Sequence, residues 1–121
     1  MSITILTVDD SRTMRDMLKL ALDEAGYHVI QAVDGQHGLE VLNQSSAQLI
    51  ITDINMPKLD GFGFIEAVRA TTKFRAVPIL VLTTESDGAK KARARQAGAT
   101  GWIVKPFDPV KLVDVIRRVA A

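Results

Sequence analysis

Several short apolar segments of this chain end in polar residues that could carry out chemistry. Asp9 and Asp10 follow the segment ITILTV, and Asp53 follows LIIT. Thr83 follows PILVL, and Lys105 follows GWIV. Together they supply three carboxylates, one hydroxyl and one ammonium group. Carboxylates bind hard divalent cations, and hydroxyl and ammonium groups donate hydrogen bonds to phosphoryl oxygens.

The three carboxylates would repel one another if the fold brought them together. At about 5 Å and an effective dielectric near 20, each pair costs a few kcal/mol, so such a cluster requires a neutralising cation. Magnesium fits best, because it takes oxygen ligands and keeps several waters. A carboxylate beside Mg²⁺ can also attack a phosphoryl group and form an aspartyl phosphate. In that chemistry Lys105 would balance phosphoryl charge and Thr83 would donate a hydrogen bond.

These residues can act together only if the elements that precede them are neighbours in the fold. Apolar, β-branched runs predict strands, and apolar residues at three-and-four spacing predict helices between them. The predicted strands cover residues 3–8, 28–32, 49–52, 78–82 and 101–104. The predicted helices cover residues 11–25, 35–42, a segment after Gly61 that uses Phe62, Ile65 and Val68, residues 86–97, and a segment that opens at Asp108-Pro109.

Strands and helices that alternate in this way predict a doubly wound α/β fold with one parallel sheet. We expect the flavodoxin-like strand order 2-1-3-4-5 with five helices, in a single domain of residues 1–121. Ligands of such sheets lie beyond the carboxyl ends of the strands, so the polar residues should converge on one rim. The helix at 86–97 has a mostly alanine inner face, and we expect it to be weakly anchored.

The composition excludes several other classes of function. The chain has 121 residues, of which 47% are hydrophobic and 24% charged, as in ordinary globular domains, and no cysteine is present for disulfides or thiolate metal sites. Apolar runs reach only about five residues, so we expect no membrane span and a cytoplasmic protein. The net charge of +1 does not favour nucleic-acid binding. Residues 1–60 carry four basic and nine acidic side chains, whereas residues 61–121 carry eleven and five.

A set of motifs in this sequence resembles the bacterial response-regulator receiver domain. The motifs are DDSRTMR at 9–15, TDINMP at 52–57 followed by DG at 60–61, LTTE at 82–85, and GATGWIVKPF at 98–107. Each motif alone is weak, but their joint occurrence in this order is highly specific and covers essentially the whole chain. Within the family the chain is most similar to single-domain chemotaxis regulators, so no output domain is expected.

The resemblance implies a site that accepts a phosphoryl group with Mg²⁺ as cofactor. Asp53 would be the phospho-acceptor and Asp10 a direct metal ligand. Asp9 would act largely through water, and Asn55 would add its backbone carbonyl. Such a domain is a phosphorylation-switched binding module rather than an enzyme, because it catalyses only its own phosphoryl transfer and dephosphorylation.

The resemblance also implies how the signal would leave the site. Lys105 would pair with the phosphoryl group, and a cis peptide bond would precede Pro106. Thr83 would move toward the phosphoryl group and free space for an aromatic side chain to turn inward. That side chain is Trp102, where tyrosine or phenylalanine is more usual, and its indole N–H needs a partner when buried. A static, packed Trp102 is the alternative interpretation.

Two further positions would tune the lifetime of the phosphorylated form. Asn55 and Glu85 lie two residues beyond Asp53 and Thr83, where they could contact a water that attacks the phosphate. The pair resembles that of chemotaxis regulators with short-lived phosphorylation. We therefore predict a transient signal.

By the same resemblance, a chemotaxis sensor histidine kinase would be the phosphoryl donor, and a flagellar motor switch protein would bind the monomeric regulator. Docking would use the face made by the fourth helix, the fifth strand and the fifth helix. The residues expected there are Trp102, Lys90, Lys91, Arg93, Lys111 and Val115. The alternative for the basic run at 90–95 is a solvated helix face, which is the usual role of such a charge run. Binding of nucleic acid is not expected there, because no aromatic residue interleaves for stacking.

Other functions stay open at the level of sequence. Asp9 and Asp10 alone would more often cap a helix than bind a metal. A phosphorelay shuttle or phosphate sink would use the same chemistry and differ only in its partners. A Mg²⁺-dependent phosphatase is less favoured, because such enzymes place an acid two residues after the nucleophile, where this chain has Asn55.

Overall fold

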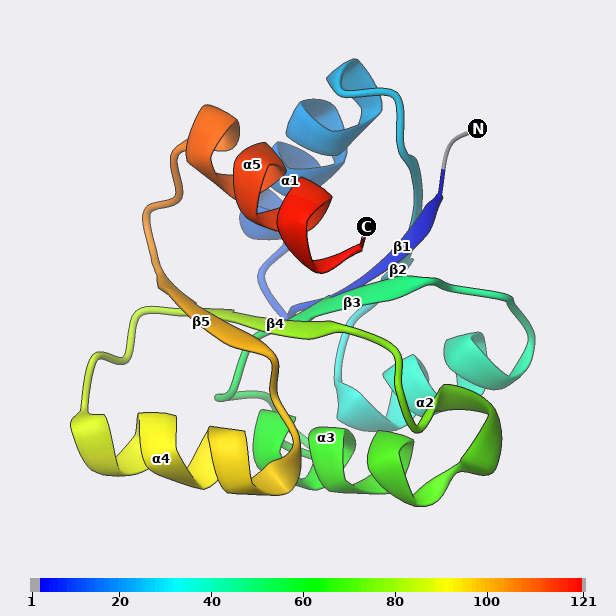
Figure 1. The fold of residues 1–121 in the computed structure, drawn as a ribbon, viewed down its shortest axis with the longest axis vertical. Helices are drawn as coiled ribbons and strands as arrows, with labels where there is room; N and C mark the ends of the chain where they lie inside the picture. Colours follow the sequence, from blue (N-terminus) through cyan, green and yellow to red (C-terminus); the bar gives the residue numbers. More distant parts are fainter. Residues whose placement is uncertain (1–2, 121) are drawn as a thin grey trace.

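The computed structural model describes residues 3–120, and within them five parallel strands form one sheet (Figure 1). The strands lie in the order β2-β1-β3-β4-β5, so the predicted order and the doubly wound topology are confirmed. Their bounds are β1 (Thr4–Val8), β2 (His28–Ala32), β3 (Leu49–Thr52), β4 (Ile79–Thr83) and β5 (Gly101–Val104).

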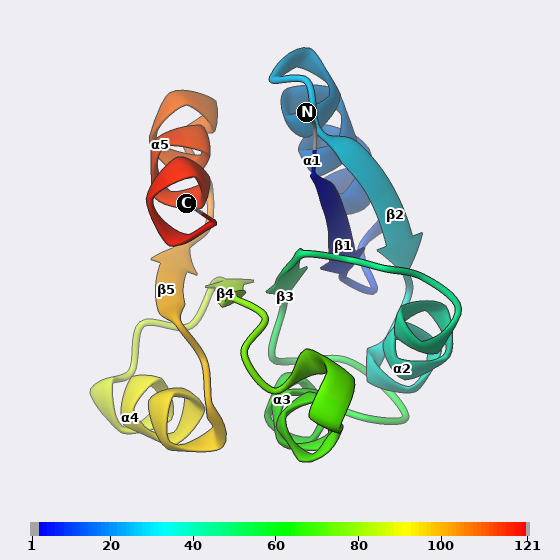
Figure 2. The same cartoon turned by 45° about the vertical axis from the view of Figure 1, so that its right-hand side comes forward.

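Both faces of the sheet are covered by helices. One face carries α1 (Arg12–Glu24) and α5 (Pro109–Val119), and the other carries α2 (Gly35–Asn43), α3 (Gly61–Ala70) and α4 (Gly88–Ala97) (Figures 1 and 2). A short 3₁₀ helix, η1 (Thr72–Phe74), lies between α3 and β4. Among residues 3–120, no helix combines the length and the apolar character that crossing a membrane would need.

The core consists of an apolar layer on each side of the sheet. Every residue of β3 and β4 is buried, as the unbroken apolar run LIIT of β3 would lead us to expect for an all-parallel sheet. On the α1/α5 side the packed residues are Ile5, Leu18, Leu22, Val29, Leu49, Ile51, Leu80, Leu82, Leu112 and Ile116. On the other side α3 contributes Phe62, Phe64, Ile65 and Val68. Close packing on both faces fixes the strand ends that carry the candidate residues.

Each α-helix begins at a side chain that accepts a hydrogen bond from a backbone N–H of the first turn. The capping residues are Ser11, Asp34, Asp60, Asp87 and Asp108. Such caps satisfy N–H groups that have no partner inside the helix. The loops after β1, β3, β4 and β5, which carry the candidate residues, are therefore held by a strand at one end and a cap at the other.

Three strands have the predicted boundaries, and the other boundaries predicted at both ends differ by one or two residues. Helix α4 begins at Gly88 rather than at residue 86, because the Asp87 carboxylate accepts the Ala89 N–H and caps the helix there. The 3₁₀ turn is not predicted, because three residues carry no readable periodicity. Among the described residues of α4, Ala94 alone is buried, which agrees with the weak anchoring expected for this helix.

Candidate functional site

Carboxylates from two strand ends meet where the strand order reverses. Asp9 and Asp10 follow β1 and Asp53 follows β3, and these strands pair directly, with Val8 opposite Thr52. Because β2 lies on the other side of β1, this rim is the topological switch point at which ligands of doubly wound folds bind. Carboxylate oxygens of the three aspartates lie within 4.8 Å of one another. The structure therefore contains the acidic cluster.

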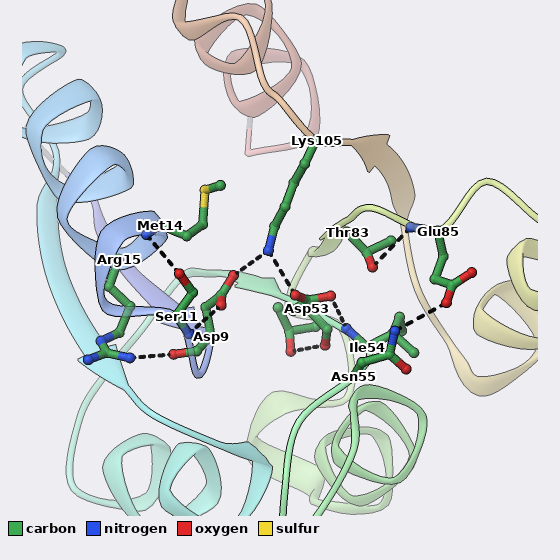
Figure 3. A network of polar contacts seen from close by, with 11 residues as sticks. Asp9, Ser11, Met14, Arg15, Asp53, Ile54, Asn55, Thr83, Glu85 and Lys105 are labelled. Carbon is green, nitrogen blue, oxygen red and sulfur yellow. Dashed lines mark hydrogen bonds and ion pairs between the residues drawn. The ribbon is translucent and has the colours of Figure 1, made fainter.

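Lys105 bridges two of these carboxylates (Figure 3). Its Nζ lies 2.9 Å from Asp9 Oδ2 and 2.8 Å from Asp53 Oδ2. Its backbone N–H donates to the Thr83 carbonyl at 2.8 Å, and its peptide bond to Pro106 is cis, as the resemblance implies. Burial acts to lower the pKa of Lys105, but the hydrogen bonds and charges of the two aspartates outweigh burial and raise that pKa. Lys105 therefore stays charged and neutralises part of the cluster.

Asp9 is the most buried member of the cluster, with 2% of its surface exposed, whereas Asp10 is exposed. Asp9 Oδ1 accepts the Ser11 backbone N–H at 2.9 Å. Burial raises the pKa of Asp9, although its hydrogen bonds act in the opposite direction. The Arg15 guanidinium donates to the Asp9 carbonyl at 2.8 Å. Arg15 lies within the DDSRTMR motif, but the motif alone does not predict this contact.

Asp53 is held in place through both its carboxylate and its backbone. Its Oδ1 accepts the Ile54 N–H at 2.6 Å, and its own N–H donates to the Val8 carbonyl at 3.0 Å, which continues the pairing of β1 with β3. Helix α3 starts close behind it, because a Cβ at Gly61 would collide with the Asp53 carbonyl oxygen. Glycine is thus the residue that allows this approach. Asp53 is 8% exposed, and its carboxylate has a fixed orientation at the rim.

The predicted hydroxyl lies at the end of β4 but contacts the next loop. Thr83 is fully buried, and its Oγ1 accepts the Glu85 N–H at 3.4 Å. Within residues 3–120 its hydroxyl makes no hydrogen bond to Asp53 or Lys105. The structure therefore brings Asp9, Asp53 and Lys105 into direct contact, whereas Thr83 contacts the loop between β4 and α4 (Figure 3).

Glu85 connects the rim to α4 and β5. Its Oε1 accepts the Asn55 side-chain amide at 3.2 Å and lies 3.0 Å from Lys90 Nζ. Its carbonyl accepts the Trp102 indole N–H at 3.0 Å, which gives that group the partner it needs. The hydrogen bond from Lys90, followed by that from Asn55, lowers the pKa of Glu85. The sequence does not predict the ion pair with Lys90, because the spacing of these two residues matches no periodic element.

The residues expected on the docking face fall into separate groups. Trp102 and Lys91 line a small hollow between β5 and α4, and Lys111 and Val115 line another between β5 and α5. Arg93 instead lies 4.0 Å from the centroid of an aromatic ring of α3. The structure thus gathers most of these residues around β5 and turns Arg93 toward α3.

The acidic cluster has the donor set of a hard divalent cation. All its side-chain donors are carboxylate oxygens, and one lysine leaves the cluster with a net negative charge. Exposed Asp10 leaves one side open to water, and Mg²⁺ keeps several waters in protein sites. The residues present therefore fit Mg²⁺.

Comparison with known proteins relates the chain to signalling proteins. Residues 5–117 match the family described as response regulator receiver domain. A protein of Rhizobium etli named "Probable chemotaxis protein CheY" is 37% identical and is matched over 97% of this chain and 92% of its own length. A "Probable transcriptional regulator ycf27" of Porphyridium aerugineum is 39% identical over 95% of this chain but only 47% of its own length.

A solved structure extends this similarity to three dimensions. The chemotaxis protein CheY4 of Vibrio cholerae superposes with a TM-score of 0.94 at 42% identity, over 98% of this chain and 99% of that one. The family match covers nearly all the described residues, and the two chemotaxis proteins are 37% and 42% identical to this chain over nearly their whole length. The chain belongs to the response regulator receiver domain family.

Proposed function

We propose that this chain takes a phosphoryl group on Asp53 from a sensor histidine kinase, with Mg²⁺ as cofactor, and so switches its binding of a partner. The observation that supports this most strongly is the surroundings of Asp53. Its carboxylate lies at the switch point of the sheet, 2.8 Å from Lys105 Nζ and beside Asp9 and Asp10. Receiver domains are phosphorylation-switched regulators rather than classical enzymes, so this chemistry serves the switch.

In the transfer step, a carboxylate oxygen of Asp53 bonds to phosphorus as the bond from phosphorus to the donor imidazole nitrogen breaks. The electron pair of the broken bond stays with the imidazole, which takes a proton from solvent. Lys105 already contacts Asp53 and would balance charge on the phosphoryl oxygens. The Ile54 N–H holds the carboxylate in one direction, so little reorganisation is needed before attack.

Asp9, Asp10, Asp53 and the backbone carbonyl of Asn55 would hold the Mg²⁺. The receiver family binds Mg²⁺ at an acidic pocket, and the clustered carboxylates of this chain support the same use. When bound, the ion supplies positive charge that offsets the carboxylates and the phosphoryl oxygens. Asp9 already uses both oxygens in hydrogen bonds, which suits a contact through water, whereas Asp10 is exposed and suits direct ligation.

The proposed signal leaves the site through Thr83, Glu85 and Trp102. Movement of the Thr83 hydroxyl toward a phosphoryl group would release the Glu85 N–H that it now accepts. Since the Glu85 carbonyl binds the Trp102 indole, a shift of this loop changes the contacts of the ring on β5. Helix α4 follows the same loop and is weakly anchored, so its displacement requires little free energy.

Asn55 and Glu85 are proposed to limit the lifetime of the phosphorylated form. They contact each other at 3.2 Å beside the acceptor, where both could meet an attacking water. We expect decay of phospho-Asp53 to be fast and to change when either residue is replaced. Slow decay that is unchanged in Asn55→Ala and Glu85→Ala would contradict a transient signal.

We further propose that the signal controls a flagellar motor in chemotaxis. The relatives named as chemotaxis proteins are matched over nearly their whole length, whereas the transcriptional regulator is matched over about half of its length. This supports a single receiver domain over residues 1–121, and we expect it to act as a cytoplasmic monomer. Its docking face around β5 would present Trp102, Lys91, Lys111 and Val115, with Lys90 and Arg93 at the edges. Lysines around an aromatic ring suit an acidic, amphipathic segment of the motor switch protein.

A binding titration tests this function. The probe is a peptide from the N-terminal segment of a flagellar motor switch protein, and the chain is activated with Mg²⁺ and beryllofluoride, a phosphoryl mimic. We expect affinity to rise about tenfold on activation and to stay at its basal value in Asp53→Asn. No gain on activation would exclude motor control and would leave a phosphorelay shuttle or phosphate sink that uses the same site.

A further inference from the structure

Lys90 forms an ion pair with Glu85, which follows β4 at the rim of the site. Its Nζ lies 3.0 Å from Glu85 Oε1, with side-chain exposures of 41% and 30%. The same oxygen accepts the Asn55 amide at 3.2 Å. Lys90 is a residue of α4, but its ammonium group contacts a side chain that lies beside the proposed phospho-acceptor.

The position of Lys90 in α4 is unfavourable unless this ion pair compensates it. Lys90 lies in the first turn of the helix, where no acidic residue is present and where the helix dipole disfavours a positive charge. The Asp87 carboxylate already caps this end through the Ala89 N–H. The lysine reaches back over the cap to Glu85, which precedes the helix. Its charge is thus used outside α4.

Glu85 is held at its backbone as well as at its side chain. Its N–H donates to Thr83 Oγ1 at 3.4 Å, and its carbonyl accepts the Trp102 indole N–H at 3.0 Å. Both side-chain contacts fall on Oε1, and within residues 3–120 none falls on Oε2. One carboxylate oxygen is therefore fixed beside Asn55, and the other is available to accept a hydrogen bond.

We propose that Lys90 is a positioning residue for the hydrolysis of phospho-Asp53, because it holds Glu85 where its second oxygen can accept a hydrogen bond from the attacking water. This inference rests on the proposed function. In the step, the water oxygen bonds to phosphorus as the bond from phosphorus to the Asp53 oxygen breaks. The electron pair returns to the Asp53 carboxylate. One proton of the water stays on the phosphate that is released, and the other passes to solvent. Lys90 touches neither water nor phosphate and acts only through Glu85.

The decay of the phosphorylated chain tests this role. The purified protein is phosphorylated with an acyl phosphate and Mg²⁺, the donor is removed, and phosphate release is followed in Lys90→Met. An exposed ion pair changes a rate by a few-fold at most, so we expect a lifetime about twofold to fivefold longer than that of the wild type. Lys90→Arg keeps the charge near Glu85 and should restore most of the wild-type rate.

An exposed ion pair on α1 supplies the matched control. Lys19 Nζ lies 2.7 Å from Asp23 Oδ2, so Lys19→Met removes the same charge and the same kind of contact away from the rim. This variant should decay as the wild type does. At about 1 M salt, charges are screened beyond about 3 Å, which weakens the attraction between Lys90 and Glu85. High salt should therefore slow decay of the wild type and of Lys19→Met toward the rate of Lys90→Met.

The outcomes separate this inference from the proposed function. If the wild type takes up no phosphate on Asp53, the proposed function is wrong. If the wild type is phosphorylated but Lys90→Met decays equally fast or faster, the proposed role of Lys90 is wrong. The same conclusion follows if Lys90→Arg is as slow as Lys90→Met. Urea denaturation should give the same free energy of unfolding for wild type and Lys90→Met, which separates positioning from a loss of structure.

Discussion

Lys105 binds two of the three clustered carboxylates, so the acidic cluster keeps a net negative charge when no cation is present. Burial raises the pKa of Asp9, which means that the folded chain holds this charge less easily than the unfolded chain does. The site is therefore assembled at some expense of stability, as is common where a protein keeps reactive groups together.

Asp9→Asn should stabilise the protein in the absence of divalent cations, by on the order of 1 kcal/mol. The sign follows from the raised pKa of Asp9 in the folded state. Protonated Asp9 favours folding, so this contribution to stability is complete below pH 3.8, the unfolded pKa of Asp9. It is lost as the pH rises through the folded pKa of Asp9. The variant does not titrate at this position. The advantage of Asp9→Asn should therefore be larger at about pH 7 than at about pH 4. Urea denaturation with a chelator present measures both values.

Asp114→Asn is the matched control for this experiment, because Asp114 is exposed on α5 and the substitution removes the same charge. Its free energy of unfolding should differ little from that of the wild type at either pH. An Asp9→Asn variant less stable than the wild type at about pH 7 would show instead that the hydrogen bonds from Ser11 and Lys105 outweigh burial.

At the scale of elements, the strands follow closely from the sequence. The runs at 28–32, 49–52 and 101–104 coincide with β2, β3 and β5, because apolar, β-branched runs bounded by polar residues define a strand well. The rim residues were predictable for the same reason, since each lies at or just beyond the carboxyl end of a strand in a parallel sheet. Helix ends are less certain, because caps such as Asp87 decide them and several capping residue types often lie close together.

Contacts between elements far apart in the chain could not be predicted. Arg69 of α3 donates two hydrogen bonds to the Gly98 carbonyl, at 3.0 and 2.8 Å, and others to the carbonyls of Phe74 and Arg75. This clamp depends on how α3 packs beside the end of α4, which periodicity does not encode. Gly98 has a φ of 120°, and a Cβ there would meet the Arg69 stem at 2.6 Å, so the joint requires glycine.

Arg69→Met should lower the free energy of unfolding by about 1 to 3 kcal/mol, because it keeps the apolar stem but leaves partly buried carbonyls without their donors. Amide hydrogen exchange should also accelerate in α4, whose anchoring is weak. Arg75→Met is the control, since Arg75 is exposed, and it should stay within about 0.5 kcal/mol of the wild type. Equal stability of Arg69→Met and the wild type would mean that the clamp does not stabilise the fold.

At the scale of the whole molecule, the charge is divided between the two halves of the chain. Residues 1–60 carry four basic and nine acidic side chains and contain the three aspartates of the cluster. Residues 61–121 carry eleven basic and five acidic side chains and contain Lys105 and the lysines around β5. The net charge of +1 conceals this partition. The division suits the proposed binding of Mg²⁺ by residues of the first half and of an acidic partner by residues of the second.

Mg²⁺ should stabilise the whole fold by mass action, by about 2.7 kcal/mol at a hundredfold excess over its Kd. The expected result is a higher Tm with Mg²⁺ for the wild type and for Asp16→Asn, which removes an exposed carboxylate on α1. Asp10→Asn should lose most of the gain, because the variant replaces the carboxylate proposed to ligate the ion directly with a neutral amide. Thermal unfolding with and without Mg²⁺ gives this comparison. A full gain in Asp10→Asn would place the metal elsewhere.

Asp53 is the proposed phospho-acceptor on which the function of the whole molecule depends. The residue that is phosphorylated can be identified directly. The chain is incubated with an acyl phosphate and Mg²⁺, and the modified residue is identified by mass spectrometry of its peptides. We predict one phosphoryl group, on Asp53, and none in Asp53→Asn, whose circular dichroism spectrum should match that of the wild type. A phosphoryl group on another residue of the wild type, or one retained in Asp53→Asn, would contradict Asp53 as the acceptor.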